Sequence, residues 1–418
     1  MVNIRKGALD VYLLGMKVGR IDYSSKKNEM CFTYDTKYLE SPECFALSHS
    51  LPLRSGPFDS PTTTVFFENL LPPDEVRRRL GPVLHISRHN IFGFLEALGG
   101  DCAGAISLWK EGAVPYETGK NRVRLTEEQA YEALKSLRKR PLYINGVDGY
   151  RISGSGAQDK LIVCLEGESV FLPLFGTPST HILKPSARDY PDSVFNEYFS
   201  MTLAARLGLD VAQCGLVRLK GEAFYWTKRY DREDVDGVTT RLHQEDFCQI
   251  LGISGELKYE SEGGPSFKSC MAAMSGMGLS LADRLSFIDR MIFNYLIGNA
   301  DAHGKNASVL YRGAQGRSLA PMYDVMSTAV YPNLSKTNAM YIGGAKGLGN
   351  TKRENFAFMA QEVGMRGALV LSRLDAMVSK IVPEACALAE TLSDCWPSGI
   401  YEKILKVIRS QAGKVTNG

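Results

Sequence analysis

A polar loop that directly follows an apolar helical run constrains the fold of this chain more than any other feature. The run at residues 282–297 repeats apolar side chains at helical spacing, which predicts a buried helix. The stretch "GNADAHGKNASVL" at 298–310 then places polar side chains, among them Asp301 and Asn306, between small residues. Two strand-like runs, "ASVLY" and "LAPMYD", predict a hairpin that brings Asp324 back to the loop. The fold must therefore gather two acids and an asparagine at one end of a buried helix.

An Asp, an Asn five residues later and a second Asp after a hairpin form a set that phosphoryl transfer by a kinase requires. One carboxylate accepts the proton of the attacking hydroxyl, while the Asn and the second Asp hold Mg²⁺, which prefers oxygen ligands. The same Asp-x-x-x-x-Asn spacing occurs in the protein-kinase catalytic loop. A polar turn whose Asp and Asn cap the local backbone explains the loop equally well when it is considered alone.

Three upstream features favour the kinase interpretation. A glycine-rich turn, "RISGSGAQDKLIVCLEG" at 151–167, runs into a strand and offers backbone N–H groups to phosphate, although it is not a Walker A motif. Lys184 lies on a strand, and Glu197, on a predicted helix, is placed to pair with it. The stretch "YWTKRYDRE" at 225–233 reads as a hinge strand. A simple turn, a solvated strand end or a core tyrosine explains each feature alone, but their order is that of kinases.

The bulk properties predict an ordinary globular protein of the cytoplasm. The chain has 418 residues, a net charge of +3 and 44% hydrophobic residues, so only a local patch could bind a polyanion. Its nine cysteines show no C-x-x-C spacing, which favours a reducing compartment. No apolar segment approaches the length of a membrane span, and the first residues carry no signal-peptide pattern.

The order of strand-like and helix-like runs predicts an α+β, two-lobed chain with an additional β-rich start and a helical end. The expected parts are an N-terminal subdomain, a helix with a linker, a β-rich nucleotide-binding lobe and a mainly helical catalytic lobe, at 1–110, 111–150, 151–245 and 246–418.

The chain resembles the HipA family, the serine/threonine kinase toxins of bacterial toxin–antitoxin systems. The resemblance extends over nearly the full length. It rests on the motifs "VFFENLLP", "GGDCAGAISL", "SGSGAQDK", "THILKP", "RYDR", "HQEDFCQILG", "KYESEGGP", "LIGNADAHGKN" and "MYDV". It implies a bilobed, protein-kinase-like fold with an extra N-terminal subdomain.

The resemblance also implies ATP and Mg²⁺ as cofactors and assigns roles to individual residues. Asp301 is the expected catalytic base, Asn306 and Asp324 the Mg²⁺ ligands, and Lys184 the phosphate-holding lysine. The remaining residues expected to bind the nucleotide lie in the glycine loop, the hinge and the catalytic loop: Ser155, Gly156, Ala157, Gln158, Asp159, Lys160, Lys228, Arg229, Tyr230, His303, Gly304, Lys305 and Tyr323.

A serine before the glycine loop is autophosphorylated in the family, which ejects the loop and silences the kinase. The matching position here is Ser153, with Ser155 as a neighbouring hydroxyl. Three positions depart from the family pattern or from ordinary kinases. Lys228 stands where an acidic or neutral residue is common, Asp159 replaces the usual Glu, and Val325 follows the metal-binding Asp where ordinary kinases have Phe-Gly.

The implied partners are a HipB-type helix-turn-helix antitoxin, operator DNA bound through the complex, and a protein substrate such as glutamyl-tRNA synthetase. The densest basic runs, "EVRRRLG" at 75–81 and "KSLRKRP" at 135–141, are either solvated helix faces or a patch that touches DNA. Two other functions stay open at this point. They are a kinase of small molecules or lipids, and an inactive co-repressor that keeps only the scaffold.

Overall fold

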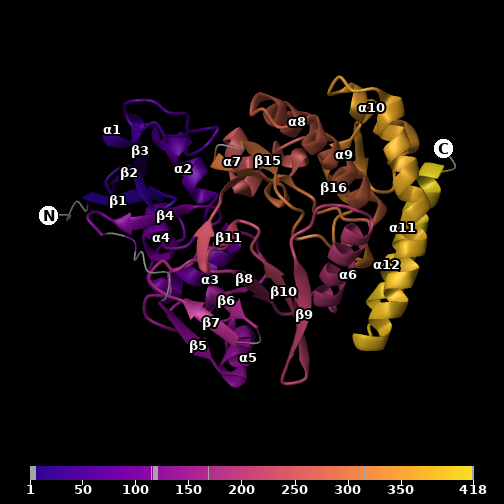
Figure 1. The fold of residues 1–418 in the computed structure, drawn as a ribbon, viewed down its shortest axis with the longest axis horizontal. Coiled ribbons are helices and arrows are strands. Elements are labelled where there is room, and N and C mark those ends of the chain that lie inside the picture. Colours follow the sequence, from indigo (N-terminus) through magenta and orange to yellow (C-terminus); the bar gives the residue numbers. More distant parts are fainter. Residues whose placement is uncertain (1–5, 114, 116–120, 168, 314–315, 417–418) are drawn as a thin grey trace.

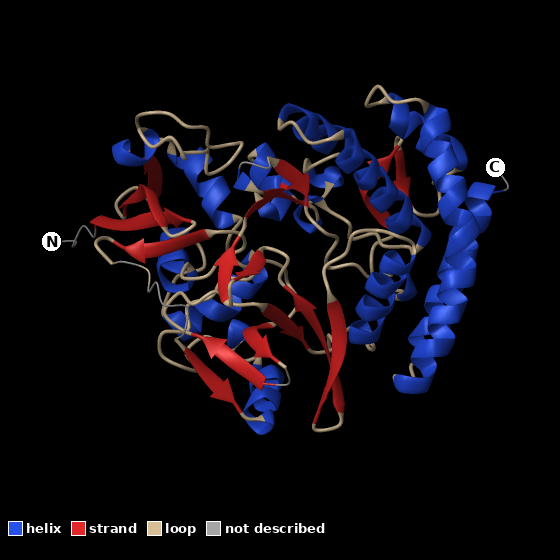
Figure 2. Ribbon diagram, viewed as in Figure 1, coloured by secondary structure: helices blue, strands red, loops and turns tan. Residues whose placement is uncertain are grey.

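The computed structural model of the protein describes residues 6–113, 115, 121–167, 169–313 and 316–416 (Figure 1). Parts of the expected first subdomain and linker, at 1–5, 114 and 116–120, therefore lie outside the described residues. Strands gather on the N-terminal side of the molecule, and long helices cover the opposite side (Figure 2). None of the helices in the described ranges is long and apolar enough to cross a bilayer.

The N-terminal part is an antiparallel sheet of strand order β3-β2-β1-β4 with four short helices around it. Alternating apolar residues place Leu9, Val11 and Leu13 in its core. The bounds of these strands and helices are β1 Lys6–Leu13, β2 Met16–Ser24, β3 Glu29–Tyr34, β4 Ile106–Lys110, α1 Thr36–Leu39, α2 Ser60–Glu68, α3 Asp74–Leu84 and α4 Ile91–Leu98.

A six-stranded antiparallel sheet of order β5-β7-β6-β8-β10-β9 follows. Strand β5, which comes from the expected linker, pairs with β7 at one edge of the sheet. Helix α5 begins with a capping box between Thr126 and Gln129. The bounds are β5 Arg122–Leu125, β6 Leu161–Glu166, β7 Ser169–Pro173, β8 His181–Lys184, β9 Cys214–Leu219, β10 Glu222–Lys228, α5 Glu127–Ser136 and α6 Ser193–Arg206.

Helices dominate the remaining chain, together with three small sheets. The longest helix, α11, runs along the outer side of this part beside α12 (Figure 1). The helices are α7 Phe247–Leu251, α8 Phe267–Gly276, α9 Leu281–Leu296, α10 Arg353–Gln361, α11 Gly367–Cys395 and α12 Ile400–Thr416. The strands are β11 Arg232–Val235, β12 Val238–Arg241, β13 His243–Asp246, β14 Ser308–Tyr311, β15 Arg317–Leu319, β16 Thr337–Ile342 and β17 Ala345–Gly347.

Two hydrophobic cores hold the chain together, and the first extends across two sheets. It joins Leu9 and Phe32 of the N-terminal sheet to Leu161 and Phe224 of the six-stranded sheet. The second core contains the apolar faces of α6 to α12. Burial of this kind contributes roughly 25 cal/mol per Å² of apolar surface, so the two N-terminal sheets stabilise one another.

The predicted hairpin exists, but its second strand is shorter than expected. Strand β15 ends at Leu319, and Pro321, which has no N–H to donate to a ladder, follows soon after. The Met322 N–H donates instead to the Asp210 carbonyl over 2.8 Å. Asp324 therefore lies on an irregular segment, with a left-handed φ of 56°, and not on a strand.

Candidate active site

The loop after α9 has a fixed backbone. Gly298 has a φ of 68°, and a Cβ at this position would lie 2.6 Å from Val407 Cγ1, so only glycine fits. The Asn299 side chain accepts a hydrogen bond from the Asp301 N–H over 3.0 Å, and the Ala300 N–H donates to Thr328 Oγ1 over 2.8 Å. The sequence thus ends a buried helix with a turn that presents Asp301 in a defined place.

Asp301 and Asn306 are linked within this loop. Asn306 Nδ2 donates to the Asp301 carbonyl over 2.9 Å, and Asn306 Oδ1 accepts no hydrogen bond from the residues that the structure describes. The Asp301 side chain is 42% exposed, and its Oδ1 accepts a hydrogen bond of 2.5 Å from the Tyr259 hydroxyl. Burial of the surrounding loop raises the pKa of Asp301 above its ordinary value, as a general base needs.

Lys184 connects the sheet to the irregular segment after β15. Its Nζ lies 2.7 Å from Glu197 Oε1 on α6 and 2.6 Å from Asp324 Oδ1. Burial would lower the pKa of Lys184, but the two carboxylates outweigh it and raise that pKa. Burial would likewise raise the pKa of Asp324, yet Lys184 holds it well below its usual range. Both groups are therefore charged at neutral pH.

The glycine loop encloses a second lysine. Lys160 Nζ donates to the carbonyls of Ser155 and Gly156, the latter at 2.9 Å, so it braces the loop from inside. Burial and the neighbouring Lys184 lower the pKa of Lys160 to about 8. Arg79 of α3 lies 2.9 Å from Asp159, which ties the loop to the N-terminal subdomain.

Other predicted residues of the glycine loop also have defined neighbours. Gln158 Nε2 donates to the Pro185 carbonyl over 3.5 Å, which places it beside the end of β8. Gly156 has a φ of 89°, a conformation that favours glycine, and Ala157 follows it in the same turn.

Ser153 is held by the N-terminal subdomain. Its N–H donates to the Asp101 carbonyl over 3.0 Å, and its Oγ donates to the Leu70 carbonyl over 2.5 Å. Only 2% of the residue is exposed. The structure therefore shows the start of the glycine loop packed inward.

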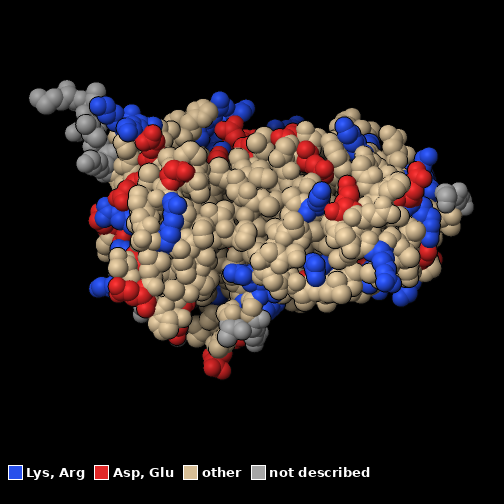
Figure 3. Space-filling view, turned by 90° about the horizontal axis from the view of Figure 1, so that it is seen from above, with Lys and Arg blue, Asp and Glu red and all other residues tan. Residues whose placement is uncertain are grey.

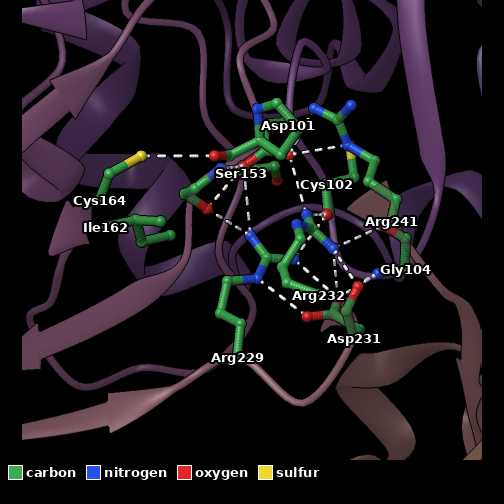
Figure 4. A network of polar contacts seen from close by, with 12 residues as sticks. Asp101, Cys102, Gly104, Ser153, Ile162, Cys164, Arg229, Asp231, Arg232 and Arg241 are labelled. Atoms are coloured by element: carbon green, nitrogen blue, oxygen red, sulfur yellow. Dashed lines mark hydrogen bonds and ion pairs between the residues drawn. The ribbon is translucent and has the colours of Figure 1, made fainter. Parts of the chain in front are cut away.

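The hinge residues do not all face the nucleotide-binding groups. Figure 4 shows the Arg229 guanidinium within a buried network around Asp101, where it also binds Asp231 and the Cys102 carbonyl. Arg232 and Arg241 bind the same Asp101 carboxylate at 2.8 Å each. The Arg229 guanidinium is therefore engaged in this buried network, and the binding of a nucleotide at the hinge stays a prediction.

The backbone N–H groups of the hinge are also partly engaged. The Lys228 N–H donates to the Gln213 carbonyl and the Arg229 N–H to the Thr180 carbonyl, at 2.7 and 2.8 Å. The Lys228 side chain is exposed. A base lying at the hinge would have to use other backbone groups.

Tyr230 and Tyr323 lie together beneath the catalytic loop. Their ring centroids are 5.1 Å apart, and the Tyr323 hydroxyl donates to the Lys305 carbonyl over 2.7 Å. Lys305 Nζ lies 2.6 Å from Asp246 Oδ2 and also binds Asn69 of the N-terminal subdomain. Lys305 therefore holds the loop in place through side-chain contacts on the side of Asp246.

Sequence reasoning did not assign roles to Asp101, Asn69 or Tyr259. All three lie within quoted motifs, "VFFENLLP", "GGDCAGAISL" and "KYESEGGP", so a signal was present. Their partners are distant in the chain, and residue spacing alone cannot identify them.

The donor set fits a nucleotide with Mg²⁺. Asn306 Oδ1 and Asp324 Oδ2 accept no hydrogen bond from the described residues, so both are available to a hard cation. No three His, Cys, Asp or Glu side chains in the described ranges gather into a metal cage. Mg²⁺ does not need one, because one or two protein oxygens and substrate phosphates commonly complete its shell.

Comparison with known proteins identifies the family. A family model described as the HipA-like C-terminal domain matches residues 152–385, and one described as the HipA N-terminal domain matches residues 9–109. The chain belongs to the HipA family. The resemblance inferred from the motifs is thereby confirmed.

Individual HipA-family relatives cover nearly the whole chain. A putative kinase, Y4mE, of Sinorhizobium fredii is 40% identical and covers 93% of both chains. The serine/threonine-protein kinase toxin HipA of Shewanella oneidensis is 28% identical over 91% of this chain and 88% of its own. These relatives confirm the prediction that this HipA-family chain is a protein kinase.

A solved structure confirms the predicted α+β, bilobed fold with its extra N-terminal subdomain. The match is the Shewanella oneidensis MR-1 HipA, solved with HipB and its operator DNA, at a TM-score of 0.85 and 26% identity. It covers 98% of this chain and 97% of the other. Helices α10 to α12 form the helical C-terminal part.

Proposed function

We propose that this chain is an ATP- and Mg²⁺-dependent serine/threonine-protein kinase that acts in the cytoplasm as the toxin of a HipA/HipB-type module. The observation that carries the proposal is the position of Lys184 Nζ between Glu197 and Asp324, with Asp301 and Asn306 on one adjoining loop. A chain that had kept only the scaffold would have no need of this charged arrangement. The intact set therefore disfavours an inactive co-repressor.

The proposed chemistry uses few residues. ATP with Mg²⁺ supplies the phosphoryl group. Asp301 accepts the proton of the acceptor hydroxyl while the hydroxyl oxygen bonds to the γ-phosphorus and the bond to the bridging oxygen breaks. Lys184 neutralises phosphate charge, and Asn306 and Asp324 hold the cation.

We further propose that Ser153 is the autophosphorylation site. Because Ser153 is buried and bound to Leu70 and Asp101, it has to leave this position to reach Asp301. A doubly charged phosphate could not return to a buried site where the serine Oγ meets the Leu70 carbonyl oxygen. Phosphorylation would therefore hold the glycine loop outside and stop the kinase.

The proposed partners are a HipB-type helix-turn-helix antitoxin and operator DNA. The solved Shewanella complex supports both. The two basic runs lie side by side, since Arg79 Nη1 donates to the Arg138 carbonyl over 3.4 Å. However, Arg77, Arg78 and Arg79 are paired with carboxylates, and the face in Figure 3 mixes both charges around an uncharged centre. We therefore assign base readout to the antitoxin.

An autophosphorylation assay with site mapping tests the function. Purified protein with Mg²⁺ and labelled ATP should take up label at Ser153, and Asp301→Asn or Asp324→Asn should abolish uptake. Asp375→Asn, which changes an exposed carboxylate paired with Arg353, is the matched control and should leave labelling intact. Equal labelling of the Asp301 variant would show that the catalytic assignment is wrong.

A second assay separates the proposed acceptors. We propose an aminoacyl-tRNA synthetase, such as glutamyl-tRNA synthetase, as the protein substrate that is modified to arrest growth. Transfer to small hydroxyl compounds or lipids, with none to protein serine or threonine, would instead favour the small-molecule kinase.

A further inference from the structure

The stretch "KYESEGGP" at residues 258–265 packs against the catalytic loop, and the proposed function gives it no role. The Gly304 N–H donates to the Lys258 carbonyl over 3.4 Å. A Cβ placed on Gly304 would come within 2.4 Å of Pro265 Cγ. The stretch therefore contacts the loop closely at both of its ends.

Tyr259 reaches from this stretch to the proposed base. Its hydroxyl donates to Asp301 Oδ1 over 2.5 Å, and its ring meets the His303 ring edge-on with centroids 5.3 Å apart. Asp301 Oδ2 accepts no hydrogen bond from the part of the chain that the structure describes. One carboxylate oxygen is thus engaged, and the other is available to accept a proton.

The backbone that carries Tyr259 is itself held firmly. The Gly264 N–H donates to the Tyr259 carbonyl over 2.9 Å, and the Tyr341 N–H donates to Glu260 Oε2 over 2.6 Å. A Cβ at Gly264 would lie 2.1 Å from the Leu257 carbonyl oxygen, so the turn is as tight as glycine allows. The hydroxyl of Tyr259 therefore reaches Asp301 from a rigid support.

We propose that Tyr259 is a positioning residue for Asp301, which fixes Oδ1 and thereby leaves Oδ2 as the oxygen that takes the substrate proton. This inference rests on the proposed kinase function. It assigns the "KYESEGGP" stretch the task of supporting the catalytic loop at Asp301, His303 and Gly304. Well-held catalytic groups matter because a small misplacement costs large factors in rate.

Tyr259→Phe tests this directly, because it removes the hydroxyl and keeps the ring on His303. We expect kcat to fall roughly tenfold or more. The KM for ATP should stay within about twofold, because phenylalanine keeps the ring contact with His303, which is expected to bind the nucleotide, and loses only the hydroxyl bound to Asp301. A purely structural role would reduce the amount of active enzyme but leave the kcat of the folded fraction unchanged.

A second readout needs neither ATP nor activity. Thermal unfolding of Tyr259→Phe, Asp301→Ala and the double variant forms a double-mutant cycle. We expect Tyr259→Phe to lower Tm when Asp301 is present and much less in the Asp301→Ala background. Tyr401→Phe is the matched control, since it removes a hydroxyl that donates to the Trp396 carbonyl over 2.8 Å elsewhere in the lobe.

The outcomes distinguish a failure of the positioning role of Tyr259 from a failure of the proposed kinase function. Tm changes that add without coupling, or a Tyr259→Phe variant with the kcat of the unmodified chain, would overturn the positioning role. Absence of any phosphate transfer by the unmodified chain, with coupled Tm changes, would overturn the proposed kinase function and leave the structural contact established.

Discussion

Lys184 Nζ lies 2.6 Å from Asp324 Oδ1, although 140 residues separate the two in the chain. Lys184 ends β8 of the six-stranded sheet, and Asp324 follows β15 of the helical lobe. The ion pair therefore joins the two lobes at the site of the proposed chemistry. Glu197 on α6 shares the same ammonium group.

Replacing Lys184 should cost stability as well as activity. Lys184→Met leaves the buried Glu197 carboxylate without a cation, and removing one partner of a buried pair typically costs about 3–5 kcal/mol. Urea unfolding without nucleotide measures the loss. Adding Glu197→Gln should recover part of it. A Lys184→Met variant as stable as the unmodified chain would contradict the buried pairing.

Glu245 should make stability depend on pH near neutrality. It is fully buried and accepts hydrogen bonds from the Tyr311 hydroxyl and the His49 N–H. Burial raises the pKa of Glu245 from 4.5 to about 7. Its favourable contribution to the free energy of unfolding is therefore complete below pH 4.5 and is lost as the pH rises through 7.

The Glu245→Gln variant should lack this titration. Relative to it, the unmodified chain should lose up to about 3 kcal/mol of unfolding free energy between pH 4.5 and 8. Urea unfolding at a series of pH values gives the comparison. Parallel curves for the two proteins would show that Glu245 is ionised throughout.

A charge at position 153 should release the glycine loop. Ser153→Glu places a buried carboxylate against the Leu70 carbonyl, whereas Ser153→Ala only removes one hydrogen bond, worth about 1 kcal/mol. Limited proteolysis with mass spectrometry should show new cleavage within residues 152–160 of Ser153→Glu. Equal resistance of both variants would mean that the pocket tolerates the charge.

Neutralising Asp101 should be among the most damaging single changes. Asp101→Asn keeps the shape of the side chain but leaves Asp231 as the acidic partner of Arg229 and Arg232 and takes the carboxylate partner from Arg241, at a cost of roughly 3–5 kcal/mol. These arginines outweigh burial and hold the pKa of Asp101 well below its usual range. The contribution of Asp101 to the free energy of unfolding is therefore present above pH 3.8 and is lost only as the pH falls far below that value.

A surface pair provides the control for Asp101→Asn. Asp22, whose side chain is 57% exposed, lies 2.8 Å from Arg20, and its replacement by Asn should cost less than about 1 kcal/mol. Both variants are compared by urea unfolding at pH 7. Similar losses would show that the buried network contributes no more than a surface pair.

Periodicity and motif order predicted much of the architecture. Short runs of alternating apolar and polar residues predicted the strands β1 to β3, and apolar residues at helical spacing predicted α9. Both predictions succeeded because local sequence patterns determine these elements. The end of β15 was missed because Met322 pairs with Asp210, far away in sequence. Local sequence cannot report such a competing partner.

The sequence predicted which types of residue form the candidate site, but not the directions in which their side chains point. Nothing in "KRYD" shows that the Arg229 guanidinium turns toward Asp101, since that depends on a carboxylate 128 residues earlier. The sequence placed Lys160 in the predicted nucleotide loop but did not show that its Nζ binds two carbonyls of that loop. Burial and long-range charge decide these orientations.

The Asp101 network also has a consequence for synthesis of the chain on the ribosome. Asp101 is made 128 to 140 residues before its three arginines, an interval of roughly ten seconds or more at ordinary rates of translation. The first core is likewise incomplete until Phe224 has been made. The N-terminal subdomain must therefore wait, partly exposed, for more than half of the protein to emerge, and during that interval it should be the part most open to chaperones and proteases.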